Sequence, residues 1–238
     1  IMMLKQYNML FIAIGIALAG FFISQTLVKS NESFNTIRVK GLAEREVKAD
    51  TAYWTVSKGL KTSDDSISTE YLYQQYEKDT QAVYDALIVQ GFTPDEVEID
   101  VANISFYDLR DEDNNLVETK RTLTGDINII TNNVDLVKTS RTSLNQLIAK
   151  GIALTNKEPE YHFTQLNAIK PDMIKEATQN ARIAAQEFAD NVGADIGGIR
   201  DASQGRFTIL DIGESYSDTK KLTKTVRVVT SVEYYLDN

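Results

Sequence analysis

The chain has 238 residues, of which 42% are hydrophobic and 25% are charged, a balance typical of a folded globular protein. It contains no cysteine and one histidine, so disulfides, thiol catalysis, zinc–cysteine centres and sites with several histidines are excluded. The net charge of −9 makes nucleic acid an unfavourable partner, because nucleic-acid binding relies on lysine and arginine side chains that neutralise phosphates.

The first 30 residues differ from the rest of the chain. Residues 9–28 carry no charged side chain, and a helix of this length rises about 30 Å, the thickness of the hydrocarbon core of a membrane. We therefore predict that residues 1–30 form an uncleaved anchor that holds the body to the inner membrane, facing the periplasm. A cleaved secretory signal is the alternative, because residues 17–19 resemble a cleavage site. Cleavage there would leave Phe21 and Phe22 close to the new N-terminus, which favours the anchor.

The first half of the body, residues 31–238, combines alternating β-branched and aromatic residues with apolar residues at helical spacing. Gly91 and Gly151 follow the helical patterns and are typical helix stops. Between them, Thr93 and Glu96 have the spacing of a capping box. The predicted elements are strands at 36–39 and 51–56, a helix at 67–90, a strand at 97–106 with a bulge at 102–103, a charged hairpin tip at 108–115, a return strand at 123–129, and a helix at 134–150 with Val137, Leu144, Leu147 and Ile148 in its core stripe.

The second half repeats this order. The predicted elements are a strand at 161–166, a helix at 171–192, a strand region at 196–211, a loop at 213–221 and a closing strand at 225–236. The apolar stripe of the helix consists of Met173, Ala177, Ala181, Ala184, Phe188 and Val192, and its small residues predict close packing on a sheet. We therefore predict an α+β fold after the N-terminal membrane segment, with two βαββ units, 36–131 and 154–237, joined by the helix at 134–150. Their sheets are expected to be mainly antiparallel and covered by helices.

This pattern resembles that of a known family. Residues 39–43, which read VKGLA, are followed by Lys-Ala-Asp at 48–50 and an aromatic strand, as at the start of a SIMPL (DUF541) domain. Ala43 and Ala49 stand where that family usually has Gly and Pro. The resemblance covers about residues 36–237 and implies a bacterial periplasmic or secreted envelope protein. Some members form ring-shaped or channel-like oligomers, and some are linked to oxidative-stress tolerance. No catalytic residues are established for the family, so none are assigned here.

One cluster of metal-binding residue types occurs in the second half. Glu158, Glu160 and His162 alternate along the chain, and two carboxylates with an imidazole could bind a divalent cation. However, Pro159 interrupts the start of the strand, and alternating polar residues are typical of any strand face in contact with water. We therefore predict no metal site.

Two further segments invite a binding role. The acidic segment 111–115 does not fit an EF-hand, because Leu116 and Thr122 stand where that loop needs Gly and Glu. The glycine-rich segment 193–198 follows a helix, whereas a phosphate-binding loop precedes one. We interpret the first as a solvated hairpin tip and the second as a helix stop, and we predict no catalytic, cofactor-binding or metal-binding residues.

These observations favour a non-enzymatic periplasmic envelope protein that self-assembles into homo-oligomers and needs no cofactor. The closing strand at 225–236 carries only Arg227 and Glu233 as protective charges, and if it lies at a sheet edge it offers unpaired backbone groups to another chain. We therefore expect an oligomer of more than two chains, held partly by strand or sheet-edge contacts. The alternative is a small-ligand-binding protein or a hydrolase with a site between the two βαββ units.

Overall fold

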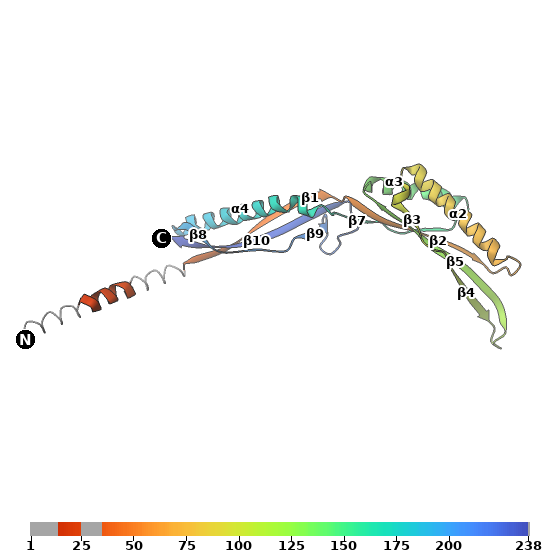
Figure 1. The fold of residues 1–238 in the computed structure, drawn as a ribbon, viewed down its shortest axis with the longest axis horizontal. Helices are drawn as coiled ribbons and strands as arrows, with labels where there is room; N and C mark the ends of the chain where they lie inside the picture. The colour runs from red at the N-terminus through yellow and green to blue at the C-terminus, as the bar shows by residue number, and fades with distance from the viewer. Residues whose placement is uncertain (1–13, 25–34, 238) are drawn as a thin grey trace, which may run out of the picture. The chain divides into compact units, whose positions relative to one another are not determined.

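The computed structural model describes residues 14–24 and 35–237, and its fold is α+β with antiparallel sheets (Figure 1). The chain divides into two compact units, each built from separate stretches of sequence. Unit 1 takes its described residues from 14–24, 35–45, 169–208 and 227–237, and unit 2 takes 46–168 and 209–226. The predicted units, 36–131 and 154–237, follow chain order, whereas these two units are interleaved along the sequence.

The predicted membrane segment lies largely outside the described residues. Within it, residues 14–24 are helical. No helix in the described ranges is both long enough and apolar enough to cross a membrane.

The sheet of unit 1 has its last strand in the middle. Its strand order is β1-β10-β8, and β9 also pairs with β10. The strands are β1 (Thr36–Lys48), β8 (Asp195–Gln204), β9 (Thr208–Asp211) and β10 (Thr223–Asp237). The condition that the closing strand lies at a sheet edge is therefore not met, because β1 and β8 pair with the two edges of β10.

Glu233, predicted to protect an exposed edge, instead connects three strands. Its carboxylate accepts hydrogen bonds from Thr36 and Arg38 of β1, at 2.8 and 2.7 Å, and from Arg200 of β8, at 3.0 Å. The residue is only 9% exposed. The hydrogen bonds from Arg38 and Thr36 hold the pKa of Glu233 below its usual value, so this carboxylate stays ionised within the sheet.

A long helix, α4 (Leu166–Val192), packs against this sheet alongside β1 and β10 (Figure 1). At Gly41 of β1, a Cβ atom would clash with the carbonyl oxygen of Ala177 and the amide nitrogen of Ala181. The backbones of strand and helix therefore approach each other directly, and the site accepts only glycine on the strand. The small residues predicted along this helix allow this close contact between helix and strand.

The buried row of α4 departs from the predicted stripe after Ala181. The fully buried residues of the helix are Met173, Ala177, Ala181, Ala185 and Ala189. Phe188 and Val192, predicted to be buried, are 48% and 57% exposed. The contact follows one continuous i, i+4 ridge, which is inclined to the helix axis, and an average helical stripe does not capture this inclination.

Replacing Ala181 by Leu should destabilise the protein by about 1–3 kcal/mol, because the larger side chain must push α4 away from β1. Chemical unfolding measures this loss. Lys175→Leu, on the exposed side of the same helix, is the matched control and should leave the unfolding midpoint nearly unchanged. Equal losses in the two variants would contradict the packing described here.

Unit 2 is a larger sheet with two helices on one face. Its order is β3-β5-β2-β6, with β4 also paired to β5 and β7 to β2. Its elements are β2 (Thr51–Thr62), α2 (Thr69–Gln90), η1 (Pro94–Glu96), β3 (Val97–Ile99), β4 (Asn103–Arg110), β5 (Leu116–Thr131), α3 (Val134–Ala149), β6 (Leu154–Asn156) and β7 (Glu160–His162). The core between sheet and helices includes Trp54, Val56, Val83, Leu87, Ile127, Ile129, Val137 and Leu144.

Local signals in unit 2 fold largely as predicted. Ser68 caps α2 by accepting from the amide of Tyr71, and Gly91 ends the helix at a φ of 114°, which favours glycine. The capping box of Thr93 and Glu96 is confirmed. The strand predicted at 97–106 is instead two strands, β3 and β4, both paired with β5. The strand predicted at 161–166 reduces to the short β7 before α4 begins.

Candidate functional site

The structure does not bring the three residues of the predicted metal cluster together. Arg141 donates two hydrogen bonds to Glu158, at 3.0 and 2.7 Å, and these lower the pKa of the Glu158 carboxyl. Glu160 lies apart from that pair, 3.5 Å from Nε2 of His162. Across the described ranges, no group of three or more His, Asp or Glu residues is arranged to hold a metal ion.

The acidic segment 111–115 forms the turn between β4 and β5. Oδ1 of Asp111 accepts hydrogen bonds from the amides of Asp113 and Asn115, at 3.0 and 2.8 Å. Hydrogen bonds from Asn115 hold the pKa of Asp111 below its usual value. The carboxylate is thus engaged in shaping the turn, as expected for a hairpin tip.

A buried ion pair in unit 2 was not predicted from the sequence. The side chains of Asp211 and Lys224 are fully buried and hydrogen-bonded to each other. Asp211 also accepts from the hydroxyl of Ser217 at 2.6 Å and from the amides of Lys220 and Lys221 at 2.8 and 3.1 Å. Every contact holds the loop 212–222 to the strands that flank it. We therefore assign this pair a structural role.

The pKa of Asp211 falls from an ordinary value of 3.8 to about 2. Burial raises this pKa, but the hydrogen bonds from Lys224, Ser217 and the two lysine amides outweigh it. Because folding favours the ionised form, the stabilisation is present above about pH 4 and is lost as the pH falls toward 2.

The variant Asp211→Asn should be less stable at neutral pH, because Lys224 is then buried without a charged partner. It should also lose less stability than the wild type between pH 4 and 2, because residue 211 then has no carboxylate that must bind a proton in this range. Urea unfolding at several pH values measures both effects. Asp218→Asn, an exposed residue of the same loop, is the control and should follow the wild-type pH profile. Identical pH profiles for all three proteins would refute this assignment.

A second buried charge lies under α2. The side chain of Lys58 is fully buried, with its Nζ 3.1 Å from Oδ2 of Asp79 and 4.9 Å from the centroid of the Tyr76 ring. Gln75 donates to the other oxygen of Asp79 at 3.0 Å. The partners of this lysine all lie on the helix that covers it, so this group also serves the packing of unit 2.

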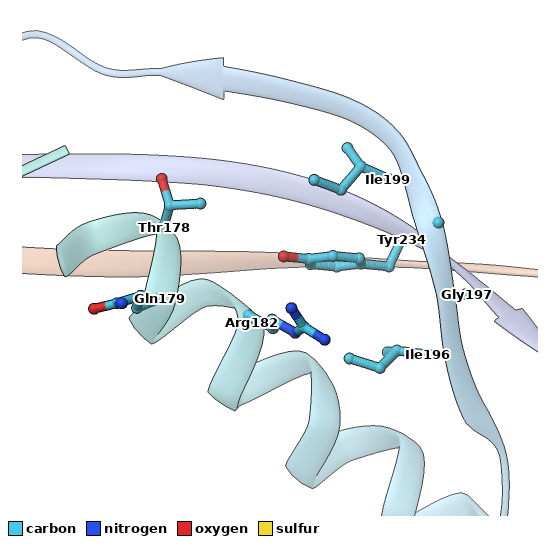
Figure 2. A pocket seen from close by; sticks show the side chains of 8 residues that line it. Thr178, Gln179, Arg182, Ile196, Gly197, Ile199 and Tyr234 are labelled. Carbon is cyan, nitrogen blue, oxygen red and sulfur yellow. The ribbon is translucent and has the colours of Figure 1, made fainter. Parts of the chain in front are cut away.

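Unit 1 contains a pocket of about 360 Å³ between α4 and the strands β8 and β10 (Figure 2). Its walls are Thr178, Gln179 and Arg182 of α4, Ile196, Gly197, Gly198 and Ile199 of β8, and Tyr234 of β10. The pairing of the strands is irregular here, because Tyr234 faces Ile199 whereas Leu236 faces Ile196. The edge strand therefore bulges by one residue at its two glycines, and bulges of this kind often border functional sites.

Three hydrogen-bond donors that line this pocket, the side chains of Gln179, Arg182 and Tyr234, have no partner among the described residues. Arg182 is exposed and makes no hydrogen bond or ion pair there. Tyr234 is only 4% exposed, and its hydroxyl likewise has no partner. Within the described chain, the fully buried side-chain atoms without a partner are the hydroxyls of Ser140 and Thr230. The hydroxyl of Tyr234 is not among them, so it keeps some exposure, and Tyr234 lines the pocket. Figure 2 shows the guanidinium of Arg182 and the ring of Tyr234 between α4 and β8.

The far end of the β4–β5 hairpin forms a ribbon that no other strand or helix covers (Figure 1). The last residue of β2, Thr62, pairs with Arg121, and beyond that point β5 pairs only with β4. Every residue of β4 is exposed. We call residues 103–121 the ribbon; its residues 107–120 are two-stranded, whereas 103–106 pair with the part of β5 that also pairs with β2. Its large apolar side chains are 40–66% exposed and comprise Ile104, Phe106, Tyr107, Leu109, Leu116 and Val117.

An apolar groove of about 560 Å³ lies elsewhere on unit 2. It is lined by Gly59, Leu60, Lys61, Ile148, Ala153, Leu154 and Thr155. Ile148, predicted to belong to the core of α3, is 43% exposed here. β6 pairs with β2 as far as Lys58, and the amide of Gly59 donates to the carbonyl of Ala153 at 3.3 Å. Only the last three residues of β2, 60–62, therefore have an edge along the groove without a backbone partner among the described residues. Lys61 and the nearby Lys150 make no ion pair within the described part of the chain.

Comparison with known proteins identifies a family. The model of the SIMPL family, described as a protein of unknown function (DUF541), matches residues 37–231. Among curated proteins, none matches this sequence.

Two solved structures have a low similarity to this chain. A Burkholderia cenocepacia protein, provisionally named an amidohydrolase/peptidase, has 12% identity and a TM-score of 0.22, covering 53% of this chain and 30% of its own. An uncharacterized conserved protein from Listeria innocua has 11% identity and a TM-score of 0.23, covering 78% of this chain and 90% of its own. At these scores neither structure carries an argument about fold or activity.

Proposed function

Because the chain belongs to the SIMPL family, whose function is unknown, we propose its role from its own surfaces: it is a non-enzymatic periplasmic protein that assembles from many copies. In this assembly the ribbon of one copy docks into the apolar groove of the next.

The exposed ribbon is the observation that carries this proposal. A two-stranded ribbon is at best marginally stable alone in water. This one presents six large apolar side chains, and exposed apolar surface of this kind marks sites of protein interaction. Its outer strand, β4, also offers an unpaired backbone edge to a further strand.

The groove can accept an added strand, and its charges are opposite to those of the ribbon tip. An added strand can pair with the open edge of β2 while its side chains enter the apolar groove, which is a common mode of peptide recognition. The ribbon tip carries Asp111, Glu112 and Asp113, whereas the groove region carries the unpaired Lys61 and Lys150. Since ribbon and groove are unlike surfaces, repeated docking closes into a ring when the rotation permits.

The uncharged segment 9–28 supports a periplasmic location with an anchor in the inner membrane. N-terminal sequencing of the mature protein should therefore find residues 1–30 still attached. A mature chain that begins at Gly20 would replace the anchor by a cleaved signal, because residues 17–19 would then have served as the cleavage site.

The body without residues 1–30 should have the mass of more than two chains in light scattering after size-exclusion chromatography. Replacing Phe106 and Tyr107 by Ser should reduce that mass to a monomer, because it removes apolar contact area without touching the core. Ile183→Ser, which alters an exposed apolar residue on α4, is the control and should leave the mass unchanged. A wild-type body that is monomeric at all concentrations would refute the assembly.

Charge exchange tests the groove as the partner surface. Replacing Lys61 and Lys150 by Glu should also yield monomers, because the acidic tip then meets like charges. Replacing Glu112 and Asp113 by Lys in the same chain should restore the larger mass, because these substitutions reverse the charge of the tip and leave the Asp111 turn contacts in place. Assembly that ignores both exchanges, while still depending on Phe106 and Tyr107, would place the ribbon against a different surface.

A further inference from the structure

We propose that the pocket of unit 1 between α4, β8 and β10 binds a small carboxylate with an apolar body. This binding site is separate from the ribbon and the groove, and it uses two of the unpartnered donors described above, the guanidinium of Arg182 and the hydroxyl of Tyr234.

The donors select the head group. The guanidinium of Arg182 has no partner among the described residues, and this side chain recognises planar carboxylates through paired N–H groups. The hydroxyl of Tyr234 is a second donor on a ring that is held in place by the core of unit 1. Thr178 already donates its hydroxyl hydrogen to the carbonyl of Ile174 at 2.8 Å, so it faces a ligand as an acceptor.

A nearby negative charge limits the charge of the ligand. The carboxylate of Asp237 lies beside Gly197, with an oxygen 2.9 Å from the position that a Cβ there would take. A second negative charge on the ligand would therefore be repelled at this end of the pocket. The pocket thus favours a monoanion such as a carboxylate over the dianion of a phosphate monoester.

The remaining walls suit an apolar body. Ile196 and Ile199 line the strand side, and Ile199 is 57% exposed when nothing covers it. A second hollow shares Gln179 and Arg182 with the pocket and continues along α4 past Ile183. The pocket volume of about 360 Å³ is within the range of small-molecule sites. A short aliphatic chain can therefore lie against the isoleucines while its carboxylate meets Arg182.

Methyl NMR of the full-length protein with labelled isoleucines tests this site with three probes: hexanoate, hexanol and inorganic phosphate. Hexanoate should shift the methyl signals of Ile196 and Ile199 and leave those of Ile127 and Ile129, in the core of unit 2, unchanged. Hexanol and phosphate should produce much smaller shifts, because hexanol lacks the carboxylate and phosphate lacks the apolar chain. Equal shifts with hexanol or with phosphate, or no shift at about 10 mM hexanoate, would overturn the proposal.

Variants identify the donors. Arg182→Gln should weaken hexanoate binding about tenfold or more, as expected for the loss of a charge-assisted hydrogen bond. Tyr234→Phe keeps the ring in the core and should weaken binding a few-fold through loss of the hydroxyl. Arg206→Gln, an exposed arginine of the same unit outside the pocket, is the matched control and should bind as the wild type does. Binding by Arg182→Gln at wild-type strength would overturn the proposal.

Discussion

The contact between the backbones of α4 and β1 determines most of what unit 1 can do. Because Gly41 has no side chain, the helix lies directly on the strand along its row of alanines. This contact fixes the position of the neighbouring helix residues Thr178 and Arg182, which form one wall of the pocket. The opposite wall is the bulged edge of β8, whose place is set by its pairing with β10. The candidate site is therefore a consequence of packing that brings two backbones unusually close.

Charged groups in this protein fall into two classes that the sequence alone does not separate. Asp211 and Lys224 are buried, and their side chains bond to each other and to residues of the loop between them. Glu233 is likewise surrounded by donors from neighbouring strands. Arg182, in contrast, has no partner among the described residues and borders an open volume. Unused hydrogen-bonding capacity next to a cavity, rather than burial or charge itself, distinguishes the candidate site from structural pairs.

Sequence patterns predicted the features that depend on near neighbours in the chain. The start and end of α2, the capping box at Thr93 and the alanine row up to Ala181 all follow from local spacing. The central position of β10 was missed, because strand order depends on pairings between residues far apart in the sequence. The pocket was missed for the same reason, since Arg182 and Tyr234 belong to different elements and neither forms a recognisable motif.

The interleaving of the two units constrains when the protein can fold. Four elements, β1, α4, β9 and β10, each continue from one unit into the other, and unit 1 combines the earliest and the latest strands of the body. The sheet of unit 1 lacks its central strand until β10, at the very end of the chain, has been synthesised. A chain that emerges from its N-terminus must therefore keep β1 unpaired until β10 has been synthesised. Such long-range closure slows folding, and deletion of β10 (Thr223–Asp237) would remove the strand with which both β1 and β8 pair.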